Sequence, residues 1–205
     1  MITIVDYGVG NLDSIRNMLQ RVGARARIVA DPDDVRRADK LILPGVGAFA
    51  HGMESLRASG MVQALKERAV DHGVPTLGIC LGLQLMTRSS EEGNVSGLGW
   101  IAARTVAFER ARLDAALRVP HMGWADVALP RTSRLFEGMP PESRFYFVHS
   151  FHVVADAECE VIATAGHGYR FAAALERDNL TGVQFHPEKS HRFGLQLLRN
   201  FAERY

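Results

Sequence analysis

The chain has few cysteines, no charge excess and no long apolar run, and each absence excludes a class of protein. Of its 205 residues only Cys80 and Cys159 are cysteine, so we expect no disulfide framework and a reducing, cytoplasmic location. Lysine and arginine number 24 against 23 aspartate and glutamate residues. This balance gives no electrostatic footprint for nucleic acid or for an anionic membrane.

Signals for targeting, cofactors and metals are also scarce. No stretch approaches the roughly 18 apolar residues of a membrane span, and the first residues lack the basic and apolar regions of a signal peptide. The GVG at residues 8–10 lacks the third glycine of a dinucleotide fingerprint. His149 and His152 have the spacing of a ligand pair, but no cysteine or acidic cluster accompanies them. We therefore expect a soluble protein without a cofactor or a metal.

The first half of the chain has the alternating pattern of an α/β protein. Short apolar runs predict strands at residues 2–6, 25–30, 40–43 and 74–79. Apolar residues at helical spacing predict helices at residues 12–22, after Asp31, at 51–72 and after Cys80. Strands that alternate with helices of this length form parallel sheets covered on both faces. We therefore expect a three-layer, mostly parallel sheet.

The second half is richer in strands and turns. Strands are predicted at residues 100–108, 124–129, 144–154, 160–164, 171–175 and 181–185, followed by a closing helix at 192–204. This pattern indicates a mixed or antiparallel extension of the sheet. No polar linker divides the chain, so residues 1–205 are expected to form one domain.

Residues 78–82 (GICLG) place Cys80 where a predicted buried strand meets a predicted helix. This is the context of a nucleophile elbow, whose flanking glycines permit a strained backbone. The helix N-terminus favours the thiolate of Cys80, and the N–H of Leu81 is placed to stabilise an oxyanion. A buried structural cysteine is the alternative, and the pentapeptide favours the catalytic interpretation over it.

Residues 185–188 (FHPE) directly follow an apolar predicted strand. In extended backbone His186 and Glu188 point to one face, so His186 can act as a general base while Glu188 orients its ring. Alone, such a short motif more often marks a surface turn. Its place at the carboxyl end of a strand, where ligand sites of α/β proteins gather, favours the catalytic interpretation.

Residues 43–49 (LPGVGAF) follow another predicted strand. Glycines on both sides of Val46 let the backbone aim an N–H into the same edge of the sheet, or rotate when a substrate arrives. Val46 and Gly47 are therefore candidates for a second oxyanion donor. An ordinary strand-to-helix turn is the alternative.

Together the three motifs resemble those of the class I (triad) glutamine amidotransferases, in order, spacing and chain length. The resemblance covers essentially the whole chain. It implies a flavodoxin-like sheet and hydrolysis of glutamine through a γ-glutamyl thioester on Cys80, with His186 and Glu188 behind it. It also implies that the ammonia is delivered to a synthase.

Further segments resemble one branch of this family, the glutaminase subunit of imidazole glycerol phosphate synthase from histidine biosynthesis. They are residues 5–12 (VDYGVGNL), 120–124 (PHMGW), 146–151 (YFVHSF) and 186–190 (HPEKS). Ala125 stands where an asparagine is common and Phe151 where a tyrosine is usual. The branch implies a heterodimer with a separate cyclase subunit, a (βα)8 barrel.

The resemblance also assigns binding residues. Gln84 and the backbone of His149, Ser150 and Phe151 are expected to hold the α-amino and α-carboxylate groups of glutamine. Gln84 lies four residues beyond Cys80, so on a helix it shares the face of the nucleophile. A solvated polar residue is the alternative, and this position favours the site.

Candidate interface residues are Asn11, Trp124 and Lys189. Tryptophan is enriched in interface cores, although a core position within the chain is an equal alternative for Trp124.

Three other functions are alternatives for a chain with these motifs. One is a triad amidotransferase that serves aminodeoxychorismate, anthranilate or GMP synthesis, which the PHMGW and YFVHSF segments disfavour. Another is a stand-alone cysteine hydrolase or peptidase on the same fold. A third is a catalytically silent binding or chaperone-like relative, which an intact Cys80, His186 and Glu188 disfavour.

Overall fold

The structure is a computed structural model that describes the backbone of residues 1–205 and every side chain except that of Cys159. The strands are β1 (Ile2–Val5), β2 (Ala26–Val29), β3 (Lys40–Leu43), β4 (Thr76–Ile79), β5 (Ser89–Ser90), β6 (Val95–Ser96), β7 (Ala103–Ala107), β8 (His121–Asp126), β9 (Arg144–His149), β10 (Phe151–Ala155), β11 (Val161–His167), β12 (Tyr169–Arg177) and β13 (Leu180–Val183). The helices are α1 (Leu12–Arg21), α2 (Pro32–Arg36), α3 (Phe49–Ala58), α4 (Met61–Leu65), α5 (Leu81–Leu85) and α6 (His191–Arg204). None of the described helices combines the length and the apolar character needed to cross a membrane.

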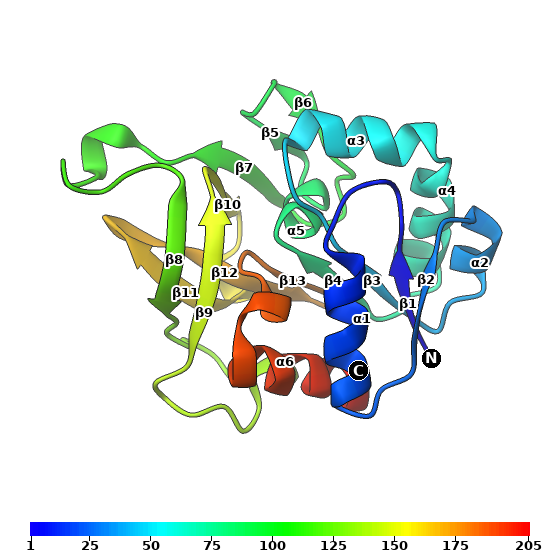
Figure 1. The fold of residues 1–205 in the computed structure, drawn as a ribbon. Coiled ribbons are helices and arrows are strands. Elements are labelled where there is room, and N and C mark those ends of the chain that lie inside the picture. Colours follow the sequence, from blue (N-terminus) through cyan, green and yellow to red (C-terminus); the bar gives the residue numbers. More distant parts are fainter.

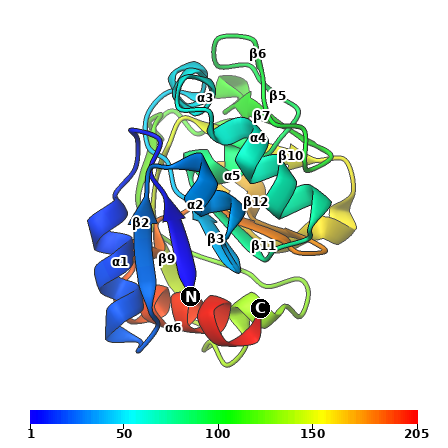
Figure 2. The same ribbon diagram turned by 90° about the vertical axis from the view of Figure 1, so that its right-hand side faces the viewer.

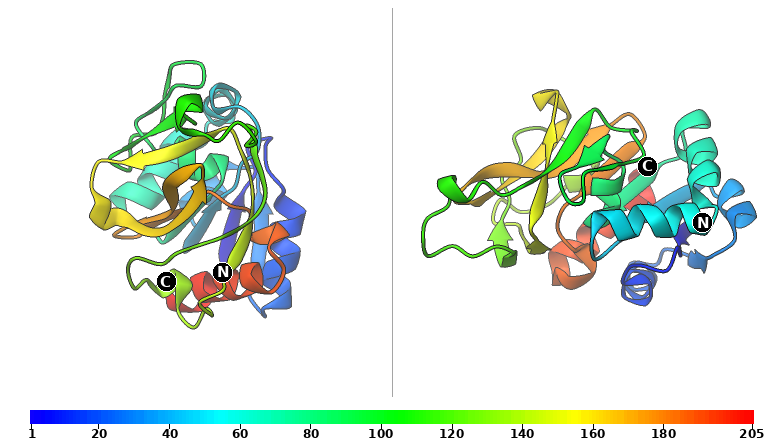
Figure 3. Two further views of the ribbon diagram at one scale, coloured as in Figure 1. Left: turned by 90° about the vertical axis from the view of Figure 1, so that its left-hand side faces the viewer. Right: turned by 90° about the horizontal axis from the view of Figure 1, so that it is seen from above.

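The main sheet has the order β2-β1-β3-β4-β13-β12-β10-β7-β5-β6, with β11 beside β12. The strands from β2 to β13 are mutually parallel, whereas β12, β10 and β7 continue the sheet in antiparallel pairing. The antiparallel strands and the N-terminal strands lie at opposite ends of the molecule (Figures 1 and 3). The predicted mostly parallel sheet with an antiparallel extension is confirmed.

Buried side chains alternate between the two faces of the sheet along each strand, and this divides the core into two layers. Ile2 and Ile4 of β1 and Ile42 of β3 belong to the layer that contains the apolar faces of α1 and α6. Leu41 and Leu43 of β3 belong to the layer under α2, α3 and α4. Side chains of successive strand residues point to opposite faces, so each parallel strand supplies both layers. Accordingly, α1 and α2 lie on opposite sides of β1 and β2 (Figure 2).

Both chain termini lie at the amino ends of the parallel strands (Figures 1 and 2). The Nζ of Lys40, at the start of β3, donates to the carbonyls of Phe201 and Ala202 in α6, at 3.0 and 2.7 Å. This contact satisfies carbonyls in the last turn of α6 that have no partner within the helix. The carboxyl ends of β1, β3, β4 and β13 are thus left to form the opposite edge of the sheet.

The single long helix predicted over residues 51–72 is wrong in its continuity. The chain instead forms α3, breaks at Gly60 and resumes as α4, because Gly60 has a φ of 70°, in the left-handed region that favours glycine. A π-helical turn, Lys66–Asp71, continues α4. There the carbonyl of Ala69 accepts a hydrogen bond from Nδ2 of Asn179 at 2.7 Å.

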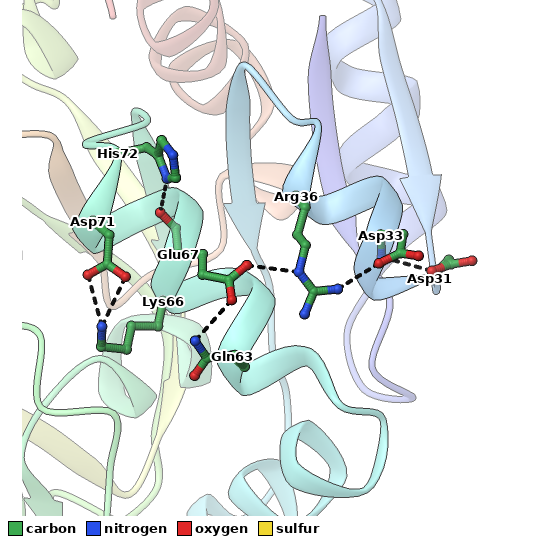
Figure 4. Close-up of polar contacts among 8 residues, drawn as sticks. All are labelled: Asp31, Asp33, Arg36, Gln63, Lys66, Glu67, Asp71 and His72. Carbon is green, nitrogen blue, oxygen red and sulfur yellow. Dashed lines mark hydrogen bonds and ion pairs between the residues drawn. The ribbon is translucent and has the colours of Figure 1, made fainter.

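Charged side chains link α2 to the π-helical turn that follows α4, at the surface of the protein (Figure 4). Asp31 caps α2, as its sequence predicts, by accepting from the N–H of Asp33 at 2.8 Å. Arg36 bridges the carboxylates of Asp33 and Glu67 at 2.7 and 2.8 Å. These pairs are exposed to solvent, which screens them, so they contribute little to stability. The fully buried Val35 beneath them provides the apolar contact that holds α2.

The second half of the chain differs from its prediction in three places. The strand predicted at residues 124–129 begins earlier, at His121, and pairs with β9 as a separate two-stranded sheet. The strand predicted at 144–154 is divided at Ser150 into β9 and β10. The reason is that β9 pairs with β8 in the small sheet, whereas β10 belongs to the main sheet. The two-residue strands β5 and β6 are too short to produce a periodic signal.

Four buried histidines surround the ring of Phe108: His121, His149, His152 and His167. Nδ1 of His149 donates to the carbonyl of Phe151 at 2.8 Å, so its Nε2 accepts from Nδ1 of His121 at 3.2 Å. Burial lowers the pKa of His149 to about 3 and that of His121 to about 4. Both rings are therefore neutral in the folded protein.

The two neutral rings of His121 and His149 predict a loss of stability in mild acid. In the unfolded chain these rings titrate near pH 6.5, so that state binds more protons below this pH and the free energy of unfolding falls. We expect the two rings together to cost on the order of 3 to 4 kcal/mol between pH 7 and pH 5, measured by urea unfolding. A His121→Gln variant, with one titrating ring fewer, should show a smaller change. A wild-type free energy of unfolding that is unchanged across this range would contradict the prediction.

Candidate active site

Cys80 occupies a sharp turn between β4 and α5. Its φ of 53° and ψ of −107° lie in a region that residues with side chains rarely adopt. The turn is tight because glycines allow close approach: a side chain at Gly82 would overlap the carbonyl of Leu43, and one at Gly78 would lie 2.7 Å from the N atom of Leu83. The structure therefore has the strand-to-helix turn that residues 78–82 predict.

His186 and Glu188 form a buried hydrogen-bonded pair. Nδ1 of His186 lies 2.8 Å from Oε1 of Glu188, and both side chains are 1% exposed. The extended backbone predicted for this pair is wrong, because Pro187–Lys189 forms a 3-10 turn. The turn nevertheless brings the two side chains together. The backbone N–H of His186 donates to the carbonyl of Tyr146 in β9 at 2.9 Å, which fixes the start of the turn.

The charge on His186 is governed by its two neighbours. Burial lowers its pKa, but Cys80 and then Glu188 outweigh burial, and the pKa rises to about 10. Nε2 of His186 makes no hydrogen bond of normal geometry to any described residue, so we attribute the effect of Cys80 on the pKa of His186 to its proximity. The folded state therefore holds this proton more tightly than the unfolded chain. The resulting stability is present below pH 6.5 and is lost as the pH rises towards 10.

A cavity of about 640 Å³ opens beside Cys80 and His186 at this edge of the sheet. All residues predicted for the site line it except Glu188, which lies behind His186, and Trp124. The lining residues are Gly10, Asn11, Val46, Gly47, Cys80, Leu81, Gln84, Glu92, Pro120, Val148, His149, Ser150, Phe151, His186 and Lys189.

An amide network connects Cys80 to the far wall of the cavity. Nε2 of the buried Gln84 donates to the carbonyl of Phe151 and to Oε1 of Gln184, both at 3.0 Å. Nε2 of Gln184 in turn lies 3.7 Å from Sγ of Cys80. The sequence interpretation omitted Gln184 from the site. A polar amide directly after the apolar strand β13 was the available signal.

Glu92 is another residue that the sequence interpretation missed, and it lines the cavity. Its Oε2 accepts a hydrogen bond from the backbone N–H of Phe49 at 2.7 Å, at the start of α3. It therefore places a carboxylate at the cavity while it caps a helix. No local motif marks this residue, because it lies in the short connection between β5 and β6.

The two candidate oxyanion donors differ in how closely their surroundings pack. Leu81 is the first residue of α5, so its N–H has no acceptor within the helix. Val46 is 40% exposed, and Gly47 has a φ of 99° with nothing within 4 Å of the position of a Cβ atom. The donor in α5 is fixed by the helix, whereas the loop at residues 46–47 is exposed and has open space around Gly47.

The predicted interface residues are accessible. Asn11 and Lys189 lie at the cavity. Trp124 is 38% exposed and stacks on His191 with ring centroids 5.5 Å apart, so a core position is excluded for it. Met122, two residues before it in β8, is 62% exposed. Among the described side chains, no group of three histidine, cysteine or acidic residues is placed to hold a metal ion.

The family model "Glutamine amidotransferase class-I" matches residues 3–204. A relative from Pseudomonas aeruginosa, named imidazole glycerol phosphate synthase subunit HisH 2, is 49% identical and is matched over 99% of both chains. A Sulfurimonas denitrificans relative, named imidazole glycerol phosphate synthase subunit HisH, is 48% identical over 99% of this chain and 98% of its own. The relative of the same name from Moorella thermoacetica is 49% identical over 98% of this chain and 94% of its own.

Solved structures share the fold at lower identity. A glutamine amidotransferase from Thermotoga maritima matches with a TM-score of 0.68 and 15% identity, over 99% of this chain and 96% of its own. PurLQS from the same organism matches with a TM-score of 0.72 and 17% identity, over 98% and 96%. The chain therefore belongs to the class I glutamine amidotransferase family, in the branch of the relatives named imidazole glycerol phosphate synthase subunit HisH.

Proposed function

We propose that this chain is the glutaminase subunit of imidazole glycerol phosphate synthase and that it hydrolyses glutamine to glutamate and ammonia. Relatives 48–49% identical over almost the whole chain carry the name of that subunit. The observation that carries the chemistry is a cysteine on a strained turn beside a buried His186–Glu188 pair, at one cavity. The whole chain acts in this proposal as one amidotransferase domain.

Thioester formation uses the proton that His186 holds. The thiolate of Cys80 attacks the carboxamide carbon of glutamine, and the negative charge moves to the carboxamide oxygen. The N–H of Leu81 and one from the loop at Val46 and Gly47 stabilise this oxyanion. The carbon–nitrogen bond then breaks, and the leaving amine takes the proton from His186 and departs as ammonia.

Hydrolysis of the thioester reverses these roles. His186, now neutral, takes a proton from water as the water attacks the thioester carbon. The carbon–sulfur bond breaks, the γ-carboxylic acid leaves and releases its remaining proton to solvent as glutamate, and the proton on His186 again faces the thiolate of Cys80. Glu188 keeps Nδ1 of His186 as the donor throughout, which fixes the tautomer of the ring.

The substrate is held by the polar groups of the cavity wall. Gln84 and the backbone at His149, Ser150 and Phe151 are proposed to bind the α-amino and α-carboxylate groups of glutamine. Their support is their place around one cavity with Cys80. A reducing cytoplasm suits this site, because it keeps the reactive thiol free.

The ammonia is used by a partner. The relatives carry a name that denotes one part of a synthase, which supports a partner cyclase, and we propose that this cyclase is a (βα)8 barrel. Asn11 and Lys189 at the cavity and the exposed Trp124 are the proposed contacts. Ala125 packs against the core and Phe151 contributes its carbonyl, so neither departure from the family pattern removes a group from the proposed chemistry.

The first prediction for this function concerns the nucleophile. Cys80→Ser or Cys80→Ala should abolish glutamine hydrolysis and leave folding and partner binding intact, since the thiolate forms the covalent intermediate. A glutamine-like electrophile should label Cys80 and spare Cys159, whose side chain lies outside the described residues. Mass spectrometry of the labelled protein tests this, and labelling at Cys159 alone would overturn the assignment.

The second concerns the pair behind the thiol. His186→Ala should reduce kcat on the order of a thousandfold or more, because it removes the acid–base group. Glu188→Gln should reduce kcat less, because the Glu188 side chain only orients His186. Glu188→Gln should also lower the pKa of His186, since it removes one of the two groups that raise it. The pH dependence of kcat/KM reports this shift. Near wild-type activity of His186→Ala in the complex would exclude this histidine from the mechanism.

The third concerns coupling to the partner. Loss of one oxyanion donor costs on the order of a hundredfold to a thousandfold in rate, so rotation of the Val46 N–H is an effective control point. We expect slow glutamine turnover by the lone chain and faster turnover in the complex, most of all with the nucleotide substrate of the cyclase. Gly47→Val should reduce this stimulation more than it changes KM, because valine is strained at a φ of 99°. A lone chain that already runs at the full rate of the liganded complex would refute the idea.

A further inference from the structure

Tyr7 is buried under the loop that supplies the second oxyanion donor. It follows β1, its side chain is 4% exposed, and its hydroxyl donates to the carbonyl of Pro44 at 2.6 Å. Burial and then the nearby Cys80 raise the pKa of Tyr7 far above its usual range, so the phenol stays protonated and can serve as a donor at any working pH. The hydrogen bond joins two loops 37 residues apart in the sequence.

The segment that Tyr7 holds is fixed from several sides. A Cβ atom at Gly45 would lie 2.7 Å from the Tyr7 hydroxyl and 2.8 Å from Cβ of Leu81 in the first turn of α5. One at Gly10 would lie 3.2 Å from Cβ of Pro44. Pro44 and Gly45 are both buried. The peptide between them therefore has little room to rotate.

The loop becomes free one residue later. Val46 is 40% exposed, and Gly47 has no atom within 4 Å of the position of a Cβ atom. The N–H of Val46 belongs to the peptide between Gly45 and Val46, the first one beyond the fixed segment. A rotation that presents or withdraws this N–H must therefore pivot on the segment that Tyr7 holds.

We propose that Tyr7 is a positioning residue whose hydroxyl pins the peptide between Pro44 and Gly45, so that rotation is confined to the next peptide and the Val46 N–H is delivered to the oxyanion. This inference rests on the proposed glutaminase function and adds a residue to it. Tyr7 touches neither the substrate nor the reacting atoms and acts through the loop. Without the hydroxyl, the peptide between Pro44 and Gly45 can also rotate. The Val46 N–H then points to the oxyanion for only part of the time.

The chain offers a matched control in Tyr205. Its hydroxyl also makes one hydrogen bond of 2.6 Å, to Oε1 of Glu176. Glu176 pairs with Thr181 at the start of β13, whereas the site follows the other end of that strand. Tyr205→Phe therefore removes an equally short tyrosine hydrogen bond away from the cavity.

The test compares Tyr7→Phe with Tyr205→Phe in the complex with the cyclase, using glutamate release and alkylation of Cys80 by iodoacetamide. Alkylation displaces iodide from a saturated carbon and forms no oxyanion, so it reports the thiolate alone. We expect Tyr7→Phe to lower kcat about tenfold to a hundredfold, less than complete loss of a donor, with KM for glutamine and the alkylation rate within about twofold of wild type. Tyr205→Phe should leave all three unchanged.

Two results would overturn the proposal. A kcat of Tyr7→Phe within twofold of that of Tyr205→Phe would show that the hydroxyl does not position the donor. A parallel fall in kcat and in alkylation would show that it acts on the thiolate. Failure of the glutaminase function itself is recognised separately, by a wild-type complex without glutamine turnover or by turnover that survives in Cys80→Ala.

Discussion

The parallel pairing of β4 with β13 is the contact on which the site depends. Ile79 lies opposite Val183, and the N–H of Cys80 donates to the carbonyl of Val183 at 2.8 Å. The two strands are far apart in the chain, yet this register brings the turn that carries the thiol next to the segment that carries His186. A slip of one residue would turn the side chains of one strand to the other face and separate the pair. The chemistry therefore depends on a register set by buried apolar side chains.

The sequence was most informative where a motif directly follows a buried strand. The order of the parallel strands places the turn at Cys80, the segment at His186 and the loop at Val46 on one edge, because carboxyl ends of parallel strands meet there. Contacts between distant elements carried no such signal. Gln184 lies beside Cys80 and Glu92 lines the cavity through side-chain hydrogen bonds that depend on the finished packing, and no local pattern encodes them.

Backbone conformation was the other limit of sequence interpretation. Apolar residues continue at helical spacing across Gly60, so periodicity alone predicts one helix where a left-handed residue divides two. At Pro187–Lys189 the backbone forms a 3-10 turn and not the extended conformation that was predicted. Glu188 nevertheless contacts His186, as predicted. The residue types determine which side chains can form a hydrogen bond, and the backbone turn determines the geometry of that bond.

The backbone of Cys80 has a consequence for how the nucleophile persists over evolutionary time. With φ at 53° and ψ at −107°, this position costs of order 1–3 kcal/mol for any residue with a side chain, and glycine would relieve most of that strain. Selection for stability alone would therefore favour replacing the residue that we propose as the nucleophile. Selection for stability would keep the apolar residues of the core, whereas it would act against this cysteine. A lineage that no longer needed the chemistry would be expected to lose the thiol before it lost the fold.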